Sequence, residues 1–471
     1  MISVLRPGRV CLSVLALAIS THGAPRQASA HPGRSGVVTA GKPTLPVAPT
    51  APGALQTANV NTTQNPSAQN ETWIALDPAN PRNLVGGTND YRFGDAQAGV
   101  ARSFDGGATW TSTTLDALDT TLGKYDAQGD PAVAALRGGV FYYAFIDFNR
   151  GDDQNRLAVA RSNDGGLTWP QLGVILDHSG PGPHDFEDKE LIAVDDTGGA
   201  FDGNVYVAWT RYPTADLERV MISRSTNGGA AFSAPAQISD STGGYQGTAP
   251  AVDRNGKLYV AWYHSSTVEI DASTNGGLAF GIDRTVAPIA DISNPIPGAF
   301  FRVFSFPAIA VDRSGGPFDG NVYVVWADEV GTGAGPDVLL SRSTDGGLSW
   351  SLPIRVSDDV NGSYQFFPAI AVTPDGTILV SFFDQRLTPG TTRYDVFFAR
   401  STNGGLSFDR NRRVSDVTSD SLLDGFGGGF IGDYAGIAAA KAFGFPYWTD
   451  TRPSNANAEG YTRRLPLLDR R

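Results

Sequence analysis

The stretch Arg342-Ser343-Thr344-Asp345-Gly346-Gly347-Leu348-Ser349-Trp350 decides the fold, because its pattern returns five more times along the chain. All copies share the form Ser-x-Asp/Asn-Gly-Gly-x-x-Trp/Phe, and the others begin at Ser103, Ser162, Ser225, Ser273 and Ser401. The glycines allow positive φ in a tight turn, the Asp or Asn caps backbone amides, and the aromatic side chain packs the turn onto its neighbours. The repeat predicts several copies of one supersecondary unit.

Four β-rich runs surround each turn. Around Asp345 they cover residues 306–312, 321–327 and 337–341 before the turn and 354–357 after it. Four short antiparallel strands in each repeat are typical of a β-propeller blade. The first run is almost wholly apolar, as in Pro368 to Val372, which predicts a buried innermost strand. The sequence therefore predicts an all-β propeller.

Inner strand pairs number seven rather than six. They cover residues 73–90, 131–147, 191–210, 249–263, 307–327, 368–384 and 434–450. The seventh unit has no Asp/Asn-Gly-Gly turn. We expect its third strand at Tyr461 to Leu467 and its outer strand to come from residues 55 to 62, which would close the ring. Seven blades are favoured, and six with an irregular end are the alternative. Aromatic residues near the ends of the second strands are expected to pack between blades.

The N-terminus has the pattern of an export signal. Arg6 and Arg9 precede the apolar run Val10 to Ile19, and Ala28-Ser29-Ala30 forms a small-x-small cleavage site. We expect residues 1–30 to be a signal peptide cleaved near Ala30, residues 31–58 to be a Pro/Gly/Ala-rich linker, and residues 59–471 to be the propeller domain. The protein would then be secreted or periplasmic, with no membrane span.

Composition limits the partners. The formal charge is −12, and loss of Arg6, Arg9 and Arg26 with the signal would take it to about −15. Because the surface is acidic and lacks a basic run, we expect no nucleic-acid partner, and a local cluster of arginines would have to hold any anionic ligand. Cys11, within the signal, is the only cysteine, so a disulfide framework is not possible. We expect a monomer.

The six turns resemble the Asp boxes of the sialidase and bacterial-neuraminidase-repeat superfamily, and the resemblance covers nearly the whole mature chain. It implies a propeller and a carbohydrate-related function. Three boxes carry Asn and three carry Phe, changes that suit a turn cap and would disable a catalytic acid, so we interpret the boxes as structural. Sialidases also have an Arg-Ile-Pro motif before the first blade. Here Gln69 to Thr72 stands at that place, and Phe301-Arg302-Val303 is the nearest match.

Propeller geometry locates the candidate site on the face away from the Asp boxes, where first strands begin and second strands end. Three Asp-x-Arg sequences end second strands in neighbouring units, and they contain Arg92, Arg386 and Arg452. Three convergent guanidinium groups would cradle the carboxylate of a sugar acid. The alternative is that each Asp pairs with its own Arg and ties the blade together. Arg150 and Arg211 lie at equivalent positions and are further candidates for substrate binding.

The starts of the first strands supply the candidate catalytic groups, which are Asp130, Glu190, Asp433 and Tyr434. Tyr434 beside a carboxylate fits a nucleophile with its base, as the sialidase pattern implies, or the base of a lyase. Asp130 or Glu190 would supply the other proton-transferring group. The alternative is that Asp433 caps a loop and Tyr434 packs in the core. His264 stands alone and is interpreted as a surface histidine.

The densest charge run is His184 to Glu190. Its carboxylates are of the kind that calcium binds, but they lack the spacing of a calcium loop, so we favour a solvated loop. No cofactor and no metal site are expected from the sequence.

Three functions remain open. The leading hypothesis is a sialidase-like glycoside hydrolase acting on a glycan with an acidic sugar, either a sialic or a uronic acid. The second is a polysaccharide lyase acting on uronate-containing glycans. The third is a propeller without catalysis that binds glycan or protein. Fold alone does not choose among them.

Overall fold

The computed structural model describes residues 58–329, 335–455 and 457–467. Within these residues the chain forms seven antiparallel sheets, so the prediction of seven blades is confirmed. The expected signal peptide and nearly all of the linker lie outside the described residues. No helix among the described residues is long and apolar enough to cross a membrane.

Each sheet is one blade, and in blades 1 to 6 the four main strands lie side by side in sequence order. Blade 1 contains β2 (Gln69–Asp77), β3 (Asn80–Asp90), β4 (Gln97–Ser103) and β5 (Thr111–Thr114), followed by the short helix α1 (Leu115–Leu118). Blade 2 contains β6 (Ala127–Leu136), β7 (Val140–Phe148), β8 (Asn155–Ser162) and β9 (Gln171–His178). Blade 3 contains β10 (Phe186–Val194), β11 (Val205–Tyr212), β12 (Arg219–Ser225) and β13 (Ala236–Gln237). Blade 4 contains β14 (Tyr245–Val252), β15 (Leu258–His264), β16 (Thr267–Ser273) and β17 (Arg284–Pro288).

The remaining blades follow the same plan with small additions. Blade 5 contains β18 (Ala308–Val311), β19 (Val322–Asp328), β20 (Asp337–Ser343) and β21 (Ile354–Arg355). Blade 6 contains β22 (Gln365–Val372), β23 (Ile378–Asp384), β24 (Arg393–Ser401) and β25 (Arg412–Arg413), with β26 (Ser419–Asp420) also on β24 and a 3-10 turn at Ser421–Leu423. Blade 7 contains β27 (Gly436–Ala440), β28 (Phe443–Asp450), β29 (Glu459–Thr462) and β30 (Leu465–Pro466).

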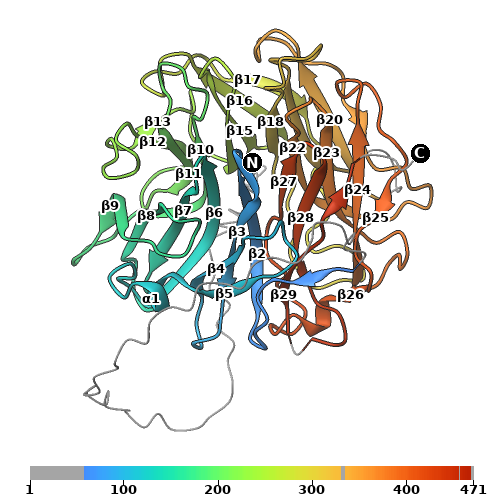
Figure 1. Cartoon of the computed structure of the whole chain (residues 1–471), viewed down its shortest axis with the longest axis horizontal. Coiled ribbons are helices and arrows are strands. Elements are labelled where there is room, and N and C mark those ends of the chain that lie inside the picture. The colour runs from blue at the N-terminus through green and yellow to red at the C-terminus, as the bar shows by residue number, and fades with distance from the viewer. Residues whose placement is uncertain (1–57, 330–334, 456, 468–471) are drawn as a thin grey trace, which may run out of the picture. The chain divides into compact units, whose positions relative to one another are not determined.

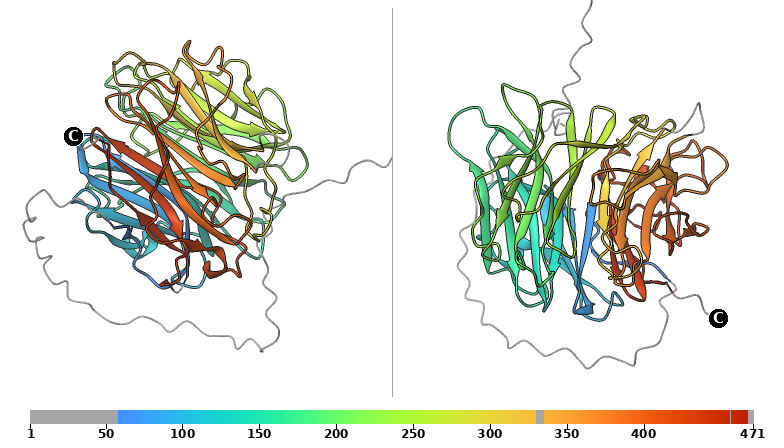
Figure 2. Two further views of the ribbon diagram at one scale, coloured as in Figure 1. Left: turned by 90° about the vertical axis from the view of Figure 1, so that its right-hand side faces the viewer. Right: turned by 90° about the horizontal axis from the view of Figure 1, so that it is seen from above.

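The ring closes between blades 7 and 1. The N-terminal strand β1 (Val60–Asn61) pairs with β29 and so forms the outer strand of blade 7, as the sequence predicted. The third strand of that blade starts at Glu459 rather than Tyr461 and stops at Thr462, after which β30 pairs separately with β28. The innermost strands β2 and β27 contact each other, and Figures 1 and 2 show the blue and red ends of the described chain side by side.

The blades stack through the aromatic residues of their second strands. Trp209, Trp262, Trp326 and Trp448 are each at most 1% exposed. Trp209, for example, belongs to a cluster that joins Tyr142 and Leu157 of blade 2 to Val207 of blade 3. Burying large flat side chains between sheets is the main source of stability in such a ring. The predicted packing of these aromatics between blades is confirmed.

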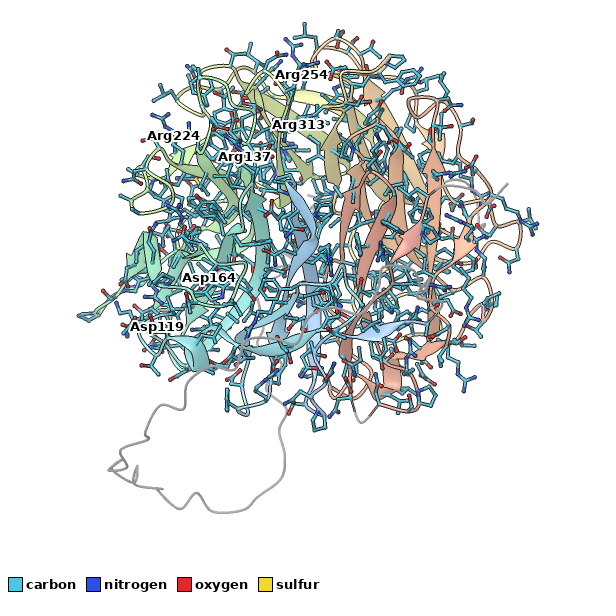
Figure 3. All side chains as sticks on the ribbon, viewed as in Figure 1. Asp119, Arg137, Asp164, Arg224, Arg254 and Arg313 are labelled. Carbon is cyan, nitrogen blue, oxygen red and sulfur yellow. The ribbon has the colours of Figure 1, made fainter. Side chains whose placement is uncertain are left out.

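The Asp boxes form the turns between third and fourth strands. In the first box, the Ser103 hydroxyl accepts a hydrogen bond from Gly107 N at 2.9 Å, and Asp105 Oδ1 accepts from Ala108 N and Thr109 N, both at 2.9 Å. The same bonds recur around Asp164, labelled in Figure 3, and Asn275 accepts them equally well. Hydrogen bonds to the Ser349 and Ser343 side chains and to backbone amides lower the pKa of Asp345 to about 2. The boxes are therefore turn caps.

Candidate active site

A β-bulge repeats at the start of the first strand in blades 1, 2, 3, 4 and 6. In each case the register shifts by one residue, and the residue within the bulge has a left-handed φ between +47° and +67°. These residues are Glu71, Asp130, Lys189, Gly247 and Phe367. Positive φ in non-glycine residues costs free energy and is concentrated at functional sites. Bulges of this kind also redirect side chains.

The bulges bring side chains from several blades together around the axis. Lys189 Nζ lies 3.3 Å from Glu71 Oε1, 3.2 Å from Asp130 Oδ2 and 2.6 Å from Asp433 Oδ2. These carboxylates come from blades 1, 2 and 7, while Lys189 comes from blade 3. We call Glu71, Asp130, Lys189, Asp433 and Arg302 the axial cluster. Its members are far apart in sequence and meet only because the ring is closed.

Arg302 enters the cluster from the long connection between β17 and β18. Its Nε and Nη2 donate to the two oxygens of Asp433 at 2.7 and 2.6 Å, a bidentate pair. Its guanidinium also lies over the Phe430 ring, 4.6 Å from the centroid. The Asp433 side chain is fully buried, but the Arg302 side chain is 38% exposed. Arg302 is therefore the cation of the cluster that reaches solvent.

Two carboxyl groups of the cluster are driven to opposite protonation states. Burial, followed by the nearby Asp130 charge, raises the pKa of Glu71 well above its usual value. Burial also disfavours the charged form of Asp130, but the Lys189 ammonium and a hydrogen bond from Glu71 hold the pKa of Asp130 below its usual value. Asn89 fixes the pair, because its Nδ2 donates to Glu71 Oε2 at 2.8 Å and its Oδ1 accepts from Asp130 N at 3.0 Å. The pair therefore consists of one carboxyl group whose pKa is raised and one whose pKa is lowered.

The pKa values of Asp433 and Asp188, the other acids around Lys189, also move in opposite directions. Burial opposes ionisation of Asp433, yet Arg302 and Lys189 lower its pKa to about 2. Burial raises the pKa of Asp188 to about 7. Burial also opposes the charge on Lys189, but the surrounding carboxylates raise its pKa well above its usual value. The cluster thus holds Asp130 and Asp433 as anions against two cations.

Glu190 follows Lys189 on β10. It is fully buried, and neither of its carboxyl oxygens has a hydrogen-bond partner among the described residues. Burial, with the Asp130 charge adding to it, raises the pKa of Glu190 well above its usual value. Burial therefore favours the neutral form of this side chain.

Tyr434 stands next to the acids. Its hydroxyl donates to Pro131 O at 3.3 Å, and its ring meets Trp73 edge to face with centroids 5.8 Å apart. Burial raises the pKa of Tyr434 well above its usual value, and the charges of Glu71 and Asp130 raise it further. The phenol is neutral unless a neighbouring carboxylate removes its proton.

An apolar pocket borders the axial cluster. Its walls are aromatic and proline side chains with Lys189, Asp433 and Tyr434 at one side; the apolar walls include Trp73, Phe304, Phe306, Pro307, Phe367 and Pro368. The rings of Phe304 and Phe306 stack with centroids 4.7 Å apart. Gly247 sits against Phe306, and a Cβ there would lie 2.6 Å from that ring. The pocket thus has apolar walls and one polar side, which suits a ligand with both polar and apolar surface.

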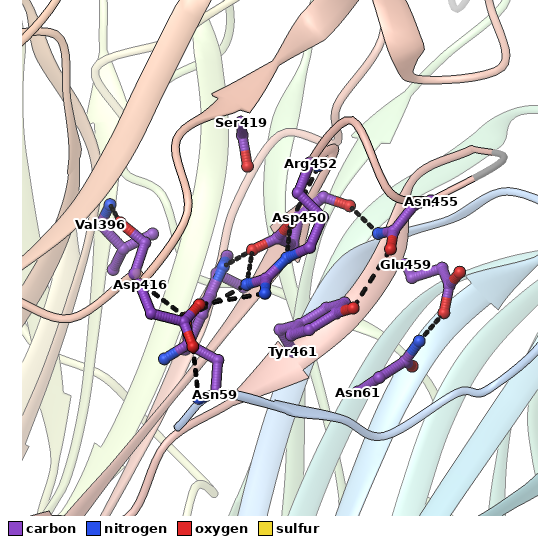
Figure 4. Close-up of polar contacts among 12 residues, drawn as sticks. Asn59, Asn61, Val396, Asp416, Ser419, Asp450, Arg452, Asn455, Glu459 and Tyr461 are labelled. Carbon is purple, nitrogen blue, oxygen red and sulfur yellow. Dashed lines mark hydrogen bonds and ion pairs between the residues drawn. The ribbon is translucent and has the colours of Figure 1, made fainter. Parts of the chain in front are cut away.

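The structure does not bring Arg92, Arg386 and Arg452 together as a carboxylate cradle. Each pairs with the aspartate two residues earlier: Arg92 Nη2 with Asp90 at 2.6 Å, Arg386 Nη2 with Asp384 at 2.7 Å, and Arg452 Nη2 with Asp450 at 2.8 Å. Each also points toward the outer part of its own blade, since they reach Ser112, Asn411 and Asn59 respectively. Each arginine therefore pairs with the Asp of its own Asp-x-Arg sequence, which was the alternative in the sequence analysis. Figure 4 shows this pairing for Arg452.

The other predicted ligands of an acidic sugar are also paired elsewhere. Arg211 Nη2 lies 2.8 Å from Glu187 Oε1, and Arg150 Nη2 lies 2.7 Å from Asp95 Oδ1. His264 Nδ1 lies 3.0 Å from Glu269, and its ring stacks on Tyr245 with centroids 4.2 Å apart. None of these three contacts the axial cluster among the described residues.

The run His184 to Glu190 is not the solvated loop expected from its charge. From Phe186 onward it forms β10, and Glu187 to Glu190 are buried. The charges are tolerated because Arg211 and the axial cluster compensate them. Among the residues described, no group of three or more His, Cys, Asp or Glu side chains has the arrangement of a metal site.

Sequence reasoning missed Glu71, Lys189 and Arg302 as members of the site. A signal for the first two was available, because Glu71, Asp130 and Lys189 each stand two residues before the apolar start of an inner pair at Trp73, Ala132 and Leu191. Arg302 lies in a connection rather than a blade, and its signal was the partial match of Phe301-Arg302-Val303 to the sialidase arginine motif.

Known structures share this architecture at low sequence identity. The endosialidase of phage phi92 aligns with a TM-score of 0.50 at 10% identity over 88% of this chain and 69% of that one. A polysaccharide lyase of family PL25, an ulvan lyase, aligns with a TM-score of 0.50 at 10% identity over 87% and 96%. A Hadza microbial sialidase aligns with a TM-score of 0.46 at 11% identity over 82% and 73%.

No family model matches the sequence, and no curated protein matches it either. At such identities the likenesses establish the fold alone. The chain is a seven-bladed β-propeller that shares its fold with the phage phi92 endosialidase and the PL25 ulvan lyase.

Proposed function

We propose that the chain is a carbohydrate-active enzyme, a glycoside hydrolase for glycans that carry an acidic sugar, with its active site at the axial cluster. The observation that carries the proposal is the pair Glu71 and Asp130, two carboxyl groups in contact whose pKa values move in opposite directions. Such a split marks the acid and base of many hydrolases. Arg302, which reaches solvent, supplies a contact for the sugar carboxylate.

The residues take distinct roles in this proposal. Asp130, the member of the pair with some exposure, delivers the proton of the pair to the glycosidic oxygen. Tyr434 is the nucleophile, and Lys189 and Arg302 stabilise negative charge. Asp433 is held by both cations and positions them. Glu190 is a buried acid whose raised pKa favours its neutral form.

The proton and bond changes balance. The Glu71 and Asp130 pair gives its proton to the leaving oxygen while the bond from that oxygen to the anomeric carbon breaks. The Tyr434 oxygen forms the new bond to the anomeric carbon, and its proton goes to the carboxyl pair. Water then attacks the anomeric carbon while the bond from that carbon to the Tyr434 oxygen breaks. Water gives one proton to the carboxyl pair and keeps the other on the product hydroxyl, and the pair gives its proton to the Tyr434 oxygen, so the site is restored.

The test compares two arginine variants, one at the axial cluster and one in an outward-facing ion pair. Arg302→Ala should lower kcat/KM on a sialyl or uronyl substrate at least about 100-fold, because the contact lies at the reacting centre. Arg92→Ala removes the same charge from an outward-facing pair and should leave kcat/KM within about threefold. Equal activity of the Arg302→Ala variant and the unmodified protein would refute the proposal.

A lyase is the second candidate. β-Elimination on a uronate needs a base beside a cation that neutralises the carboxylate, and Tyr434 lies near Lys189, whose Nζ is 5.9 Å from the ring centroid. An unsaturated product that absorbs in the near ultraviolet would identify this reaction. Glycan retention with no product from any acidic substrate would instead favour a binding propeller.

Export is part of the proposal. The secreted protein should begin after Ala30, and N-terminal sequencing of protein recovered outside the cytoplasm tests this. Recovery of the chain inside the cytoplasm with residues 1–30 intact would contradict it.

A further inference from the structure

A glycine-rich connection before blade 7 presents two phenylalanine rings on the face of the axial cluster. Residues 424–430 read Asp-Gly-Phe-Gly-Gly-Gly-Phe. The buried Asp424 carboxylate accepts hydrogen bonds from Phe426 N at 2.6 Å, Gly428 N at 2.9 Å and Phe430 N at 2.8 Å. Three glycines of the loop have φ between +74° and +89°, a region that favours glycine. One carboxylate thus fixes the loop, and the loop presents the rings of Phe426 and Phe430, both partly exposed.

These two rings belong to a continuous row of flat side chains that includes Arg302. Tyr91 meets Phe426 edge to face with centroids 4.9 Å apart, and Phe426 meets Phe430 in the same way at 5.8 Å. The Arg302 guanidinium lies 4.6 Å from the Phe430 centroid and 5.9 Å from the Phe304 centroid. In order of contact, we call Tyr91, Phe426, Phe430, Arg302 and Phe304 the aromatic row. Its members come from three segments, which are the end of β3, the connection before β27 and the connection before β18.

The aromatic row is continuous with the proposed active site. Phe304, at one end of the row, lines the axial pocket, whereas Tyr91, at the other end, does not. Between them, Arg302 donates to Asp433 through Nε and Nη2, and its guanidinium makes no other hydrogen bond among the described residues. Since a guanidinium group has five N–H donors, Arg302 keeps donors for a ligand carboxylate. The row therefore starts in the pocket and continues beyond it, with a cation along its length.

The surface around the row is also apolar and open. Phe93, two residues after Tyr91, is 67% exposed, and Phe300, two residues before Arg302, is 66% exposed. Exposed apolar surface with polar groups at its rim marks a binding site. A sugar ring carries C–H groups on its faces and hydroxyl groups at its edge, so it packs flat on an aromatic ring while its hydroxyl groups stay in water. A succession of aromatic rings therefore fits a succession of sugars.

We propose that the aromatic row binds a glycan chain over several sugar units, with an acidic sugar held at Arg302 inside the chain rather than at its end. An internal position follows because Arg302 has an aromatic neighbour in each direction along the row, Phe430 and Phe304. The sugar at Arg302 is acidic because the only charged member of the row is a cation that binds carboxylates. The choice of a glycan rests on the proposed function, and the substrate is then a polymer that is cut internally.

The test measures the affinity of fluorescein-labelled oligosaccharides by fluorescence anisotropy, with a disaccharide and an octasaccharide from hyaluronan and the same pair from polygalacturonate. All proteins carry Tyr434→Phe, so that no oligosaccharide is cut during the measurement. This parent protein should bind the octasaccharide of at least one series at least about tenfold more tightly than the disaccharide. The variant Phe426→Leu with Phe430→Leu keeps apolar side chains but removes the flat rings, and should reduce that ratio to less than about threefold.

The matched control is Phe104→Leu with Phe280→Leu, which makes the same change in two Asp boxes on the opposite face of the propeller. The control should keep the ratio of the parent protein. Tyr91→Leu is a second variant in a different segment of the row. It should also lower the ratio, and it carries the test if the double variant does not fold.

Binding requires no turnover, so this proposal and the proposed function can fail separately. No binding, or equal affinity of the parent protein for the disaccharide and the octasaccharide in both series, would overturn the inference. The same ratio in the folded row variants as in the parent protein would also overturn it. If the row variants lose the ratio but the protein with Tyr434 intact cuts no acidic glycan, the proposed function alone is refuted.

Discussion

The protein contains two kinds of arginine and carboxylate contact that use the same groups for different purposes. At the ends of the second strands, each Asp-x-Arg pair joins residues two positions apart within one blade, as in Asp450 and Arg452. At the axis, Asp433 contacts Arg302 across 131 positions of sequence and Lys189 from another blade. In the Asp-x-Arg pairs, each carboxylate is neutralised by an arginine of the same blade. At the axis, several carboxylates lie around the single Lys189 ammonium. There, the pKa of Glu71 is raised while that of the contacting Asp130 is lowered.

Removal of Lys189 should give the largest effect. Lys189→Met leaves Asp130 and Asp433 buried with one cation fewer, and we expect the free energy of unfolding to fall by about 3–5 kcal/mol. Urea denaturation at pH 7 measures this. Arg150→Met breaks an exposed pair with Asp95 and should cost about 0–1 kcal/mol. Similar losses in the two variants would mean that the axial cluster is held no differently from a surface ion pair.

Removal of an outward-facing arginine should lower the free energy of unfolding by an intermediate amount and leave kcat/KM unchanged. Arg452→Ala leaves the buried Asp450 without its guanidinium partner, also removes contacts to Asn59 and Asp416, and should cost about 2–3 kcal/mol. The value of kcat/KM for the folded protein should stay unchanged, in contrast to Arg302→Ala. Thermal unfolding and a turnover assay below the transition measure the two quantities. Loss of turnover in the folded Arg452→Ala variant would mean that this arginine belongs to the active site after all.

The smallest effect should appear as a pH dependence. The pKa of Asp188 is raised to about 7, so its contribution to stability is present below the ordinary pKa near 4 and is lost as pH rises through 7. Asp188→Asn mimics the protonated acid and should therefore gain roughly 1–3 kcal/mol relative to the unmodified protein between pH 4 and pH 8. Asp433, with its pKa lowered to about 2, behaves oppositely, because its contribution is lost as pH falls from about 4 through 2. Urea denaturation at pH 4, 6 and 8 tests the sign.

The architecture could be predicted because each blade carries its own signals. Turn caps such as Asp345 and aromatics such as Trp326 act within a blade or between neighbours, so local sequence reports them. The closing strand was also predictable, since blade 7 lacked an outer partner until β1 supplied it.

The candidate site could be predicted only in part. Asp130, Glu190, Asp433 and Tyr434 were found because they begin first strands, and all four lie at or next to the axial cluster. The cradle of Arg92, Arg386 and Arg452 was not found, because position on one face does not fix the direction of a long side chain. Lys189 and Glu71 interact across 118 positions, and that contact depends on bulges that the sequence does not display.

The strand β1 has a consequence for the order in which the molecule assembles. Its neighbour β29 is separated from it by nearly the whole domain, and Asn61 bonds to Glu459 across 398 positions. Closing so long a loop is slow and comes late in folding. Until residue 462 has been made, β1 has no partner strand, and until blade 7 has formed, Lys189 lacks its contact with Asp433. The axial cluster therefore forms only after the last blade has been synthesised, so a chain that ends before blade 7 would lack the Asp433 contact of Lys189.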